Sequence, residues 1–135
     1  MGNHPSKAPG KVAEEFVHDT IHQNNVVIFS KRSCGYCDAA KRALRVEAKR
    51  LGQAGCSVPK PTVVELDDGS LPPEVAREVQ SILLKMTGES TVPRVFLNQS
   101  FVGGATETIK YAQEGGLQFA LMKAGQCNVA ENEYQ

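Results

Sequence analysis

The sequence has no excess of charge of either sign. Fifteen Lys and Arg residues balance fifteen Asp and Glu residues over 135 positions, so the formal net charge at pH 7 is zero. A chain without an overall basic field does not gather nucleic acid or anionic lipid through its net charge. We therefore expect no nucleic-acid partner.

Long apolar segments are missing as well. No stretch approaches the roughly 18 consecutive apolar residues that a membrane-spanning helix needs. The first residues lack the apolar centre of a secretory signal and the Arg-rich pattern of a transit peptide, which favours a cytoplasmic location. One weak membrane signal remains, the M-G-x-x-x-S myristoylation pattern at Gly2, and the alternative there is a plain polar tail. We expect a membrane contact only if Gly2 is acylated.

The sequence has few close cysteine pairs, since of its four cysteines only Cys34 and Cys37 lie near each other. A structural zinc site usually needs a second close pair or closely spaced histidines, and covalent haem needs a histidine where Asp38 stands. We expect Cys56 to be a small loop thiol without a catalytic task. Cys127 lies in a polar tail, where it is either an inert exposed thiol or half of an intermolecular or mixed disulfide.

The chain length predicts one domain, large enough to bury a core without disulfides or a structural metal. Both ends are polar and poor in apolar periodicity. This composition predicts a flexible N-terminal tail over residues 1–11, a folded domain over residues 12–124 and a flexible C-terminal tail over residues 125–135.

Apolar periodicity inside the domain predicts alternating helices and strands. The predicted helices cover residues 13–24, 39–52, 72–88 and, with an interruption at 115–116, 106–121. The predicted strands cover residues 26–30, 62–66, 94–98 and 101–102. Two strands joined by a helix form a right-handed parallel unit, and the later hairpin must add antiparallel strands. The expected fold is α/β, with one mixed four-stranded sheet flanked by helices on both faces.

The close cysteine pair stands where the strand of residues 26–30 gives way to a helix. A thiol at a helix N-terminus lies near the positive end of the helix dipole and near unpaired N–H groups, which favour the thiolate. Lys31 and Arg32 add positive charge. We predict that Cys34 is the exposed nucleophile and that Cys37, one helical turn further, is more buried. The alternative is two ordinary reduced cysteines, which this placement disfavours.

Three separated motifs, in this order, resemble a dithiol glutaredoxin. They are KRSCGYC at residues 31–37 after the strand VVIFS, TVPRVF at 91–96 and GGAT at 103–106. The resemblance extends over about residues 12–122. It implies a thioredoxin fold and an enzyme that uses glutathione to reduce protein disulfides and glutathione mixed disulfides. We expect the protein to be a monomer in this role.

The resemblance also implies the roles of individual residues. Cys34 resembles the nucleophile, and Cys37 resembles the cysteine that resolves the mixed disulfide. The implied glutathione contacts are Lys31, Tyr36, Gln80, Thr91, Val92, Pro93, Gly104, Ala105, Thr106 and Glu107. Pro93 resembles the family's cis-proline, and the Val92 backbone would pair with the glutathione cysteine. Residues 104–107 match the helix start that holds the γ-glutamyl carboxylate.

Three of these contacts would be made by side chains. Lys31 resembles a lysine that meets a glutathione carboxylate, Tyr36 resembles an aromatic wall, and Gln80 stands where a glutamine often reaches the glycine end. Three positions depart from the family pattern, namely Gly35, Ser90 and Glu107. Ser90 replaces an arginine that often precedes T-V-P, which removes one cationic contact, and Glu107 replaces the more usual aspartate.

Gly35 stands where proline is commonest in the family, and it opens a second possibility. Relatives with Gly or Ser there can hold a [2Fe–2S] cluster between two monomers, with Cys34 of each monomer and two glutathiones as ligands. Glycine lacks the ring that stiffens and crowds the loop. A third possibility is a thioredoxin-like protein reduced by a flavoprotein, against which Lys31, Gln80 and the glycines at 103–104 argue.

Overall fold

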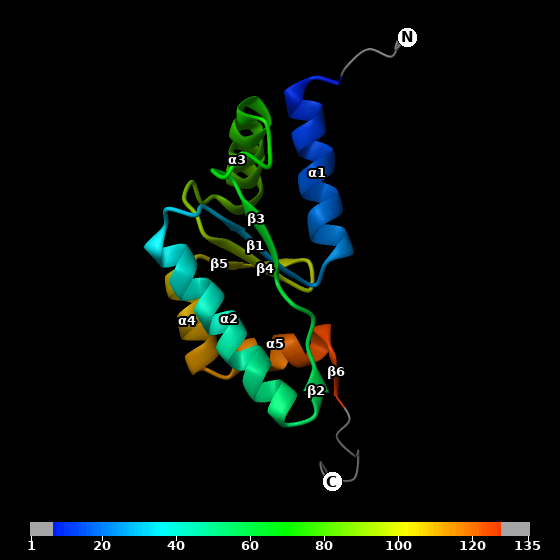
Figure 1. The fold of residues 1–135 in the computed structure, drawn as a ribbon, viewed down its shortest axis with the longest axis vertical. Helices are drawn as coiled ribbons and strands as arrows, with labels where there is room; N and C mark the ends of the chain where they lie inside the picture. The colour runs from blue at the N-terminus through cyan, green and yellow to red at the C-terminus, as the bar shows by residue number, and fades with distance from the viewer. Residues whose placement is uncertain (1–6, 128–135) are drawn as a thin grey trace.

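A computed structural model describes residues 7–127 and shows a central four-stranded sheet with strand order β3-β1-β4-β5 (Figure 1). β1 (Val26–Ser30) runs parallel to β3 (Thr62–Glu65) and antiparallel to β4 (Arg94–Leu97). β4 turns back into β5 (Ser100–Gly103), which pairs with it antiparallel. The predicted mixed sheet is therefore confirmed.

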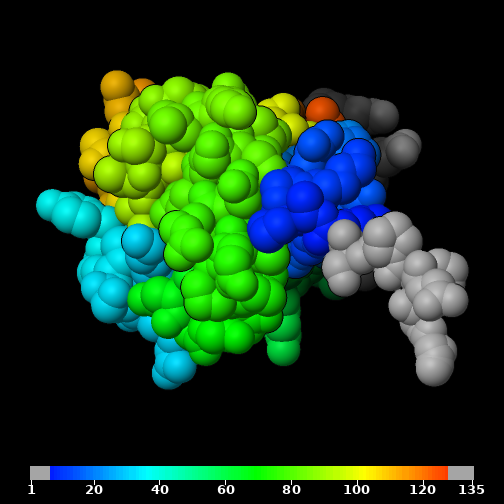
Figure 2. All heavy atoms as spheres, turned by 90° about the horizontal axis from the view of Figure 1, so that it is seen from above, coloured from blue at the N-terminus to red at the C-terminus, as the bar shows by residue number. Residues whose placement is uncertain are grey.

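Helices cover both faces of this sheet, as the sequence predicts. α1 (Pro9–Gln23) packs beside α3 (Pro73–Thr87) on one face, and Figure 2 shows the two together from above, in blue and green. The other face is covered by α2 (Gly35–Gln53), α4 (Ala105–Gln113) and α5 (Gly116–Ala124). α3 ends at Gly88, whose φ of 77° is the left-handed conformation that glycine adopts without strain.

β1 is buried at every position and divides its side chains between two cores. Val27 and Phe29 pack under α1 and α3, whereas Val26 and Ile28 pack under α2, α4 and α5. Burying one such side chain contributes roughly 1.5–3 kcal/mol. A strand held on both faces and both edges gives the residues that follow Ser30 a fixed starting point.

The first helix begins earlier than predicted. It starts at Pro9 rather than Ala13, so residues 9–11 belong to the helix and not to a tail. Proline suits the first helical turn because N–H groups there have no intrahelical acceptor, so the N–H group that proline lacks is not missed. Just before the helix, the Lys7 ammonium donates to the Glu15 carboxylate at 2.7 Å.

The predictions for residues 1–6, which include acylation of Gly2, and for residues 128–135 lie outside the described residues. Within residues 7–127, no helix combines the length and the apolar composition that crossing a membrane requires.

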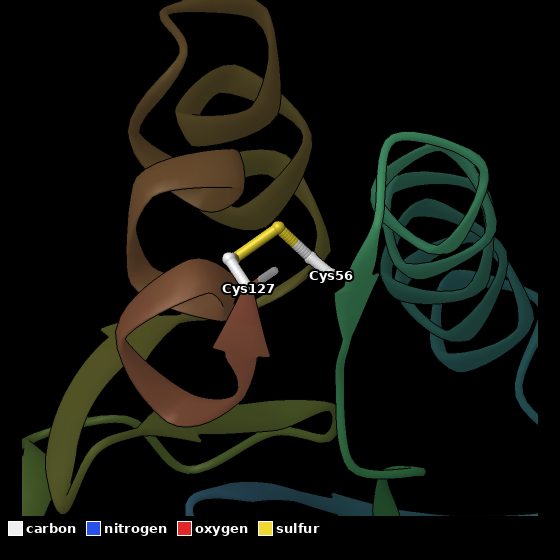
Figure 3. Close-up of a disulfide and its surroundings, with 2 residues drawn as sticks. All are labelled: Cys56 and Cys127. Carbon is white, nitrogen blue, oxygen red and sulfur yellow. A yellow bond between two sulfur atoms is a disulfide. The ribbon is translucent and has the colours of Figure 1, made fainter. Parts of the chain in front are cut away.

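A second, two-stranded sheet forms at the far end of α2, and the sequence analysis did not predict it. β2 (Cys56–Ser57) pairs antiparallel with β6 (Gln126–Cys127), and a disulfide joins Cys56 to Cys127 across a separation of 71 residues (Figure 3). The expectations of a free loop thiol at Cys56 and of a flexible tail through Cys127 are therefore wrong. Gly125 permits the close approach, because a Cβ there would lie 2.2 Å from the Ser57 carbonyl oxygen.

The disulfide should contribute strongly to stability. In a chain-entropy treatment, closing a loop of this length lowers the entropy of the unfolded chain by the equivalent of about 4 kcal/mol. We predict that replacing Cys56 and Cys127 by serine lowers the free energy of unfolding by up to about that amount, measured by urea denaturation.

The control uses a background in which Cys34 and Cys37 are already serine, so that only this disulfide responds to reductant. Dithiothreitol should then bring the Cys56–Cys127 protein to the stability of the double-serine variant and leave that variant unchanged. Identical denaturation midpoints with and without the disulfide would contradict the prediction.

Candidate active site

Cys34 forms the N-cap of α2, directly after the turn that follows β1. Its sulfur accepts a hydrogen bond from the Cys37 backbone N–H at 3.2 Å, and its carbonyl oxygen accepts one from the Asp38 N–H at 3.2 Å. The first bond satisfies a helix-start donor that has no intrahelical acceptor, and it stabilises negative charge on the sulfur. The side chain is partly exposed. Cys34 therefore lies at the helix N-terminus, as predicted.

Cys37 lies one turn further along α2 and is completely buried. Both cysteines carry free thiols. Burial raises the pKa of the Cys37 thiol to about 11, and its hydrogen bond with Cys34 acts in the same direction. Cys37 is thus protonated at neutral pH. Its burial, beside the partial exposure of Cys34, confirms the predicted contrast between the two cysteines.

The segment before β4 lies opposite Cys34. The Val92–Pro93 peptide bond is cis, as the resemblance implies. The Cys34 thiol approaches the Val92 carbonyl oxygen at 3.9 Å. The sheet brings these residues together, because β4 runs antiparallel to β1 with Arg94 opposite Phe29. The start of β4 therefore meets the end of β1.

A hollow of about 350 Å³ lies beside this segment, and we call it the Pro93 hollow. Its lining consists of Tyr36, Glu89, Thr91, Val92, Pro93, Gly104, Ala105, Thr106 and Glu107. Every glutathione contact implied by the resemblance lines it except Lys31 and Gln80. Glu89 lines it without having been predicted. The hollow joins the start of α2, the loop before β4 and the start of α4.

The start of α4 is shaped around Glu107. The Gly104 N–H donates to the Glu107 carboxylate at 2.7 Å, so this predicted anion-binding group already has an acceptor. Ala105 and Thr106 lie in the first helical turn, where backbone N–H groups have no intrahelical acceptor. Gly103 has a φ of 138°, and a Cβ there would lie 2.5 Å from the Glu107 Cβ, so glycine is required.

The two predicted contacts outside the hollow have other neighbours. The Gln80 side-chain oxygen accepts a hydrogen bond from an Arg94 guanidinium nitrogen at 2.5 Å, which leaves the Gln80 amide nitrogen as a donor. Lys31 is partly exposed in the turn before Cys34, and its carbonyl oxygen accepts the Cys34 N–H at 3.3 Å.

Arg94 is a site residue that the sequence analysis missed. It is fully buried, and its guanidinium donates to the Glu89 carbonyl oxygen through Nε at 3.0 Å and through Nη2 at 2.7 Å. Burial lowers the pKa of Arg94, and the charge of Glu89 opposes that shift. Burying a cation is costly unless its donors are bonded. The available signal was a charged residue inside the apolar strand RVFL.

Asp67 is the second residue that was missed, because the sequence analysis took it only for part of a turn. Its carboxylate accepts the Arg32 N–H at 2.7 Å, the Ser33 N–H at 3.3 Å and the Ser33 hydroxyl at 3.0 Å. The bond from the Arg32 backbone makes the largest contribution, and together these bonds hold the pKa of Asp67 below its usual range. Asp67 follows β3 and ties that strand to the turn that carries Cys34.

Comparison with known proteins identifies the family. The glutaredoxin family model matches residues 26–102, more than half of the chain. "Glutaredoxin-2, mitochondrial" of Bos taurus is 40% identical over 98% of this chain and 76% of its own length. "Glutaredoxin-C5, chloroplastic" of Arabidopsis thaliana is 38% identical over 85% of this chain and 59% of its own length. Both relatives extend beyond the matched part.

A solved structure adds evidence on the fold. The crystal structure of a buckwheat glutaredoxin–glutathione complex superposes with a TM-score of 0.65 at 30% identity, covering 89% of this chain and 96% of that one. This likeness shows the thioredoxin fold that the sequence motifs imply.

The names of the relatives correct one expectation. The sequence analysis favoured a cytoplasmic location from the absence of targeting patterns, whereas the bovine and Arabidopsis relatives are named as mitochondrial and chloroplastic proteins. The cytoplasmic prediction is therefore wrong. A pattern missing from the first residues was too weak an observation to carry it.

The match covers the strand before Cys34, the cysteine pair and the cis-proline segment, which are the parts that meet in the structure. The chain therefore belongs to the glutaredoxin family and is a glutathione-dependent thiol–disulfide oxidoreductase.

Proposed function

We propose that Cys34 is the nucleophile and that the Pro93 hollow binds the glutathione part of the substrate. The observation that carries this assignment is the position of the Cys34 sulfur. It accepts a hydrogen bond from the N-terminus of α2 and lies 3.9 Å from the Val92 carbonyl oxygen, beside the hollow. Cys37, buried and protonated, lacks both the exposure and the charge for the first attack.

The proposed reaction with a glutathione mixed disulfide has two exchange steps. The Cys34 thiolate attacks the glutathione sulfur, and one S–S bond forms as the original S–S bond breaks. The substrate thiolate leaves with the electron pair of the broken bond and takes a proton from solvent. A second glutathione thiolate then attacks the glutathione sulfur held on Cys34, which yields oxidised glutathione and restores the Cys34 thiolate.

Protein disulfides are the second proposed substrate class. Here Cys37 attacks the mixed disulfide between Cys34 and the protein, and two glutathiones reduce the resulting Cys34–Cys37 disulfide. With a pKa of about 11, Cys37 must first lose its proton. The route through external glutathione is therefore the easier one for glutathione mixed disulfides.

The lining of the hollow suggests how glutathione lies. The Val92 backbone would pair with the glutathione cysteine, as an added strand pairs with a sheet edge. The N–H groups of Ala105 and Thr106 suit the γ-glutamyl carboxylate, and the Glu107 carboxylate suits the neighbouring ammonium. Thr91, Pro93, Gly104 and Tyr36 would complete the walls.

Two further side chains would bind the glycine end of glutathione. Arg94 occupies the Gln80 side-chain oxygen and so leaves the Gln80 amide nitrogen to donate to a carboxylate. Lys31, in the turn before Cys34, would supply the positive charge. Ser90 supplies no charge where the family often has arginine, so Lys31 has the larger share of this contact.

We also propose that Asp67 positions the nucleophile without touching the substrate. Its carboxylate bonds two successive backbone N–H groups just before Cys34, so it sets the path by which the chain enters α2. Small displacements of a reacting atom lower rates strongly. In the part of the chain that the structure describes, the Asp68 carboxylate accepts hydrogen bonds only from Ser70, within its own turn, and it has the same charge as Asp67, so it is a natural control.

Binding of a [2Fe–2S] cluster is a separate proposal. Among residues 7–127, no three His, Cys, Asp or Glu side chains gather as metal ligands, so the described part of one chain offers no complete ligand set for a cluster. A cluster would therefore need a second copy and two glutathiones, which would add thiolate ligation to the glutathione site. One observation favours it: apart from its chain neighbours and the backbone of its own helix, no described atom lies within 4 Å of the Cβ position of Gly35, so packing does not explain the glycine beside Cys34.

The first of three predictions for the proposed site distinguishes the roles of the two cysteines. Cys34→Ser should lower kcat/KM for a small glutathione mixed disulfide by more than about a thousandfold, because the nucleophile is lost. Cys37→Ser should retain most of that activity and lose reduction of protein disulfides. An assay coupled to glutathione reductase measures both. A Cys37→Ser enzyme as inactive as Cys34→Ser would instead show an obligatory dithiol route.

The second prediction concerns Asp67. Asp67→Ala should lower kcat/KM for the same substrate by about three- to tenfold, because the turn before Cys34 loses its acceptor. Asp67→Asn, which keeps a carbonyl oxygen for the Arg32 N–H, should recover much of the loss. Asp68→Ala should be neutral. Equal effects of the two alanine substitutions would point to lost charge rather than positioning.

The third prediction tests the cluster. Anaerobic reconstitution with iron, sulfide and glutathione should give a dimer with visible absorption, and Gly35→Pro should suppress both. Proline suits the first position of α2, so oxidoreductase activity should survive the substitution. A wild-type protein that remains colourless and monomeric after reconstitution would exclude this function.

A further inference from the structure

A second hollow, of about 430 Å³, lies on α2 away from the Pro93 hollow, and the proposed reaction does not use it. Lys41, Arg45 and Ala48 of α2 line one side, and residues 58–61 together with Val63 of β3 line the other. We call it the basic groove. It shares no lining residue with the Pro93 hollow.

The charged side chains that line the groove are all basic. Lys41, Arg45 and Lys60 line it, and no acidic side chain does. Lys41 is already paired, since its ammonium bonds the Glu65 carboxylate at 2.6 Å and both side chains are largely buried. Arg45 and Lys60 are exposed and have no ion-pair partner among the described residues. Because the whole chain is neutral, this is a local concentration of charge.

The surface between these cations is apolar. Ala48, Val58, Pro59 and Pro61 contribute to it, and Val63 is 42% exposed, which is unusual for a valine in a strand. An apolar floor between unpaired cations complements a chain in which acidic side chains flank hydrophobic ones. The groove contains no aromatic side chain on which bases would stack, so it suits a protein better than a single-stranded nucleic acid.

Edge geometry indicates the shape of the ligand. Among the described residues, β3 is an outer strand of the sheet and pairs only with β1, so they leave its other edge open. An open edge offers backbone donors and acceptors to an extended segment. Pro59 and Pro61 lack N–H groups, so an unbroken series of backbone donors begins only at Thr62, next to Val63 of the groove.

We propose that the basic groove binds an extended acidic segment, with hydrophobic residues between its acidic ones, of a protein that the enzyme reduces. β3 leads into Asp67, which bonds the turn before Cys34, so a segment lying along this strand is directed toward the active-site end of the sheet. The substrate role rests on the proposed function. Binding itself needs no catalysis and is tested separately.

The test uses a fluorescent synthetic peptide in which pairs of glutamates alternate with pairs of valines, so that each face of the extended chain carries both residue types, and two matched double variants. Arg45→Glu with Lys60→Glu reverses the charge of the groove, whereas Lys85→Glu with Lys123→Glu makes the same change on exposed lysines of α3 and α5. Anisotropy should show saturable binding to wild type, and about tenfold weaker binding to the groove variant only. Replacing the peptide's valines by serines should also weaken binding.

Three results would overturn the proposal. They are no saturable binding to wild type, equal losses in both double variants, or an oligonucleotide that binds the groove more tightly than the peptide. In nuclear magnetic resonance spectra, the backbone amide signals that shift when the peptide is added should belong to residues 41–48 and 58–65. Shifts confined to other residues would place the peptide elsewhere and contradict the proposal as well. All variants should reduce a small glutathione mixed disulfide at the wild-type rate, so failure of the groove leaves the proposed function untouched.

Discussion

The active site depends on the burial of β1. This strand is buried at every position and paired along both edges, parallel to β3 and antiparallel to β4. The pairing brings the end of β1, the end of β3 and the start of β4 together at one end of the sheet, where the strands begin or finish. Cys34 follows the first, Asp67 follows the second and the cis Val92–Pro93 bond precedes the third. A shift in either register would separate these groups.

Polar groups then hold the converging loops in place. Asp67 bonds the backbone before Cys34, and the buried Arg94 bonds the Glu89 carbonyl oxygen and so holds the loop that leads to Val92. Both act through backbone atoms. Such bonds keep a loop in one conformation, so the positions of Cys34 and of the Pro93 hollow depend on two residues that do not line the hollow.

α2 connects two different kinds of sulfur chemistry. Its N-terminus carries Cys34 beside the Pro93 hollow, and the chain after its C-terminus carries Cys56, which forms the disulfide with Cys127. The basic groove lies on the same helix between them. Cys34 is partly exposed at the positive end of the helix dipole, whereas Cys56 is buried within the core.

The sequence by itself determined the alternating elements, the placement of Cys34 at a helix start and the family, because each is encoded in short, continuous segments. VVIFS followed by KRSCGYC already defines a buried strand, a turn and a helix N-terminus. Only the tertiary structure decided the Cys56–Cys127 disulfide, the bonds of Asp67 to the turn before Cys34 and the burial of Arg94. Each of these joins segments that are distant in sequence or depends on what surrounds a side chain, and spacing contains no information about that. Gln80, which the resemblance implies as a glutathione contact, likewise received its neighbour Arg94 from the fold, because the two residues lie on different elements.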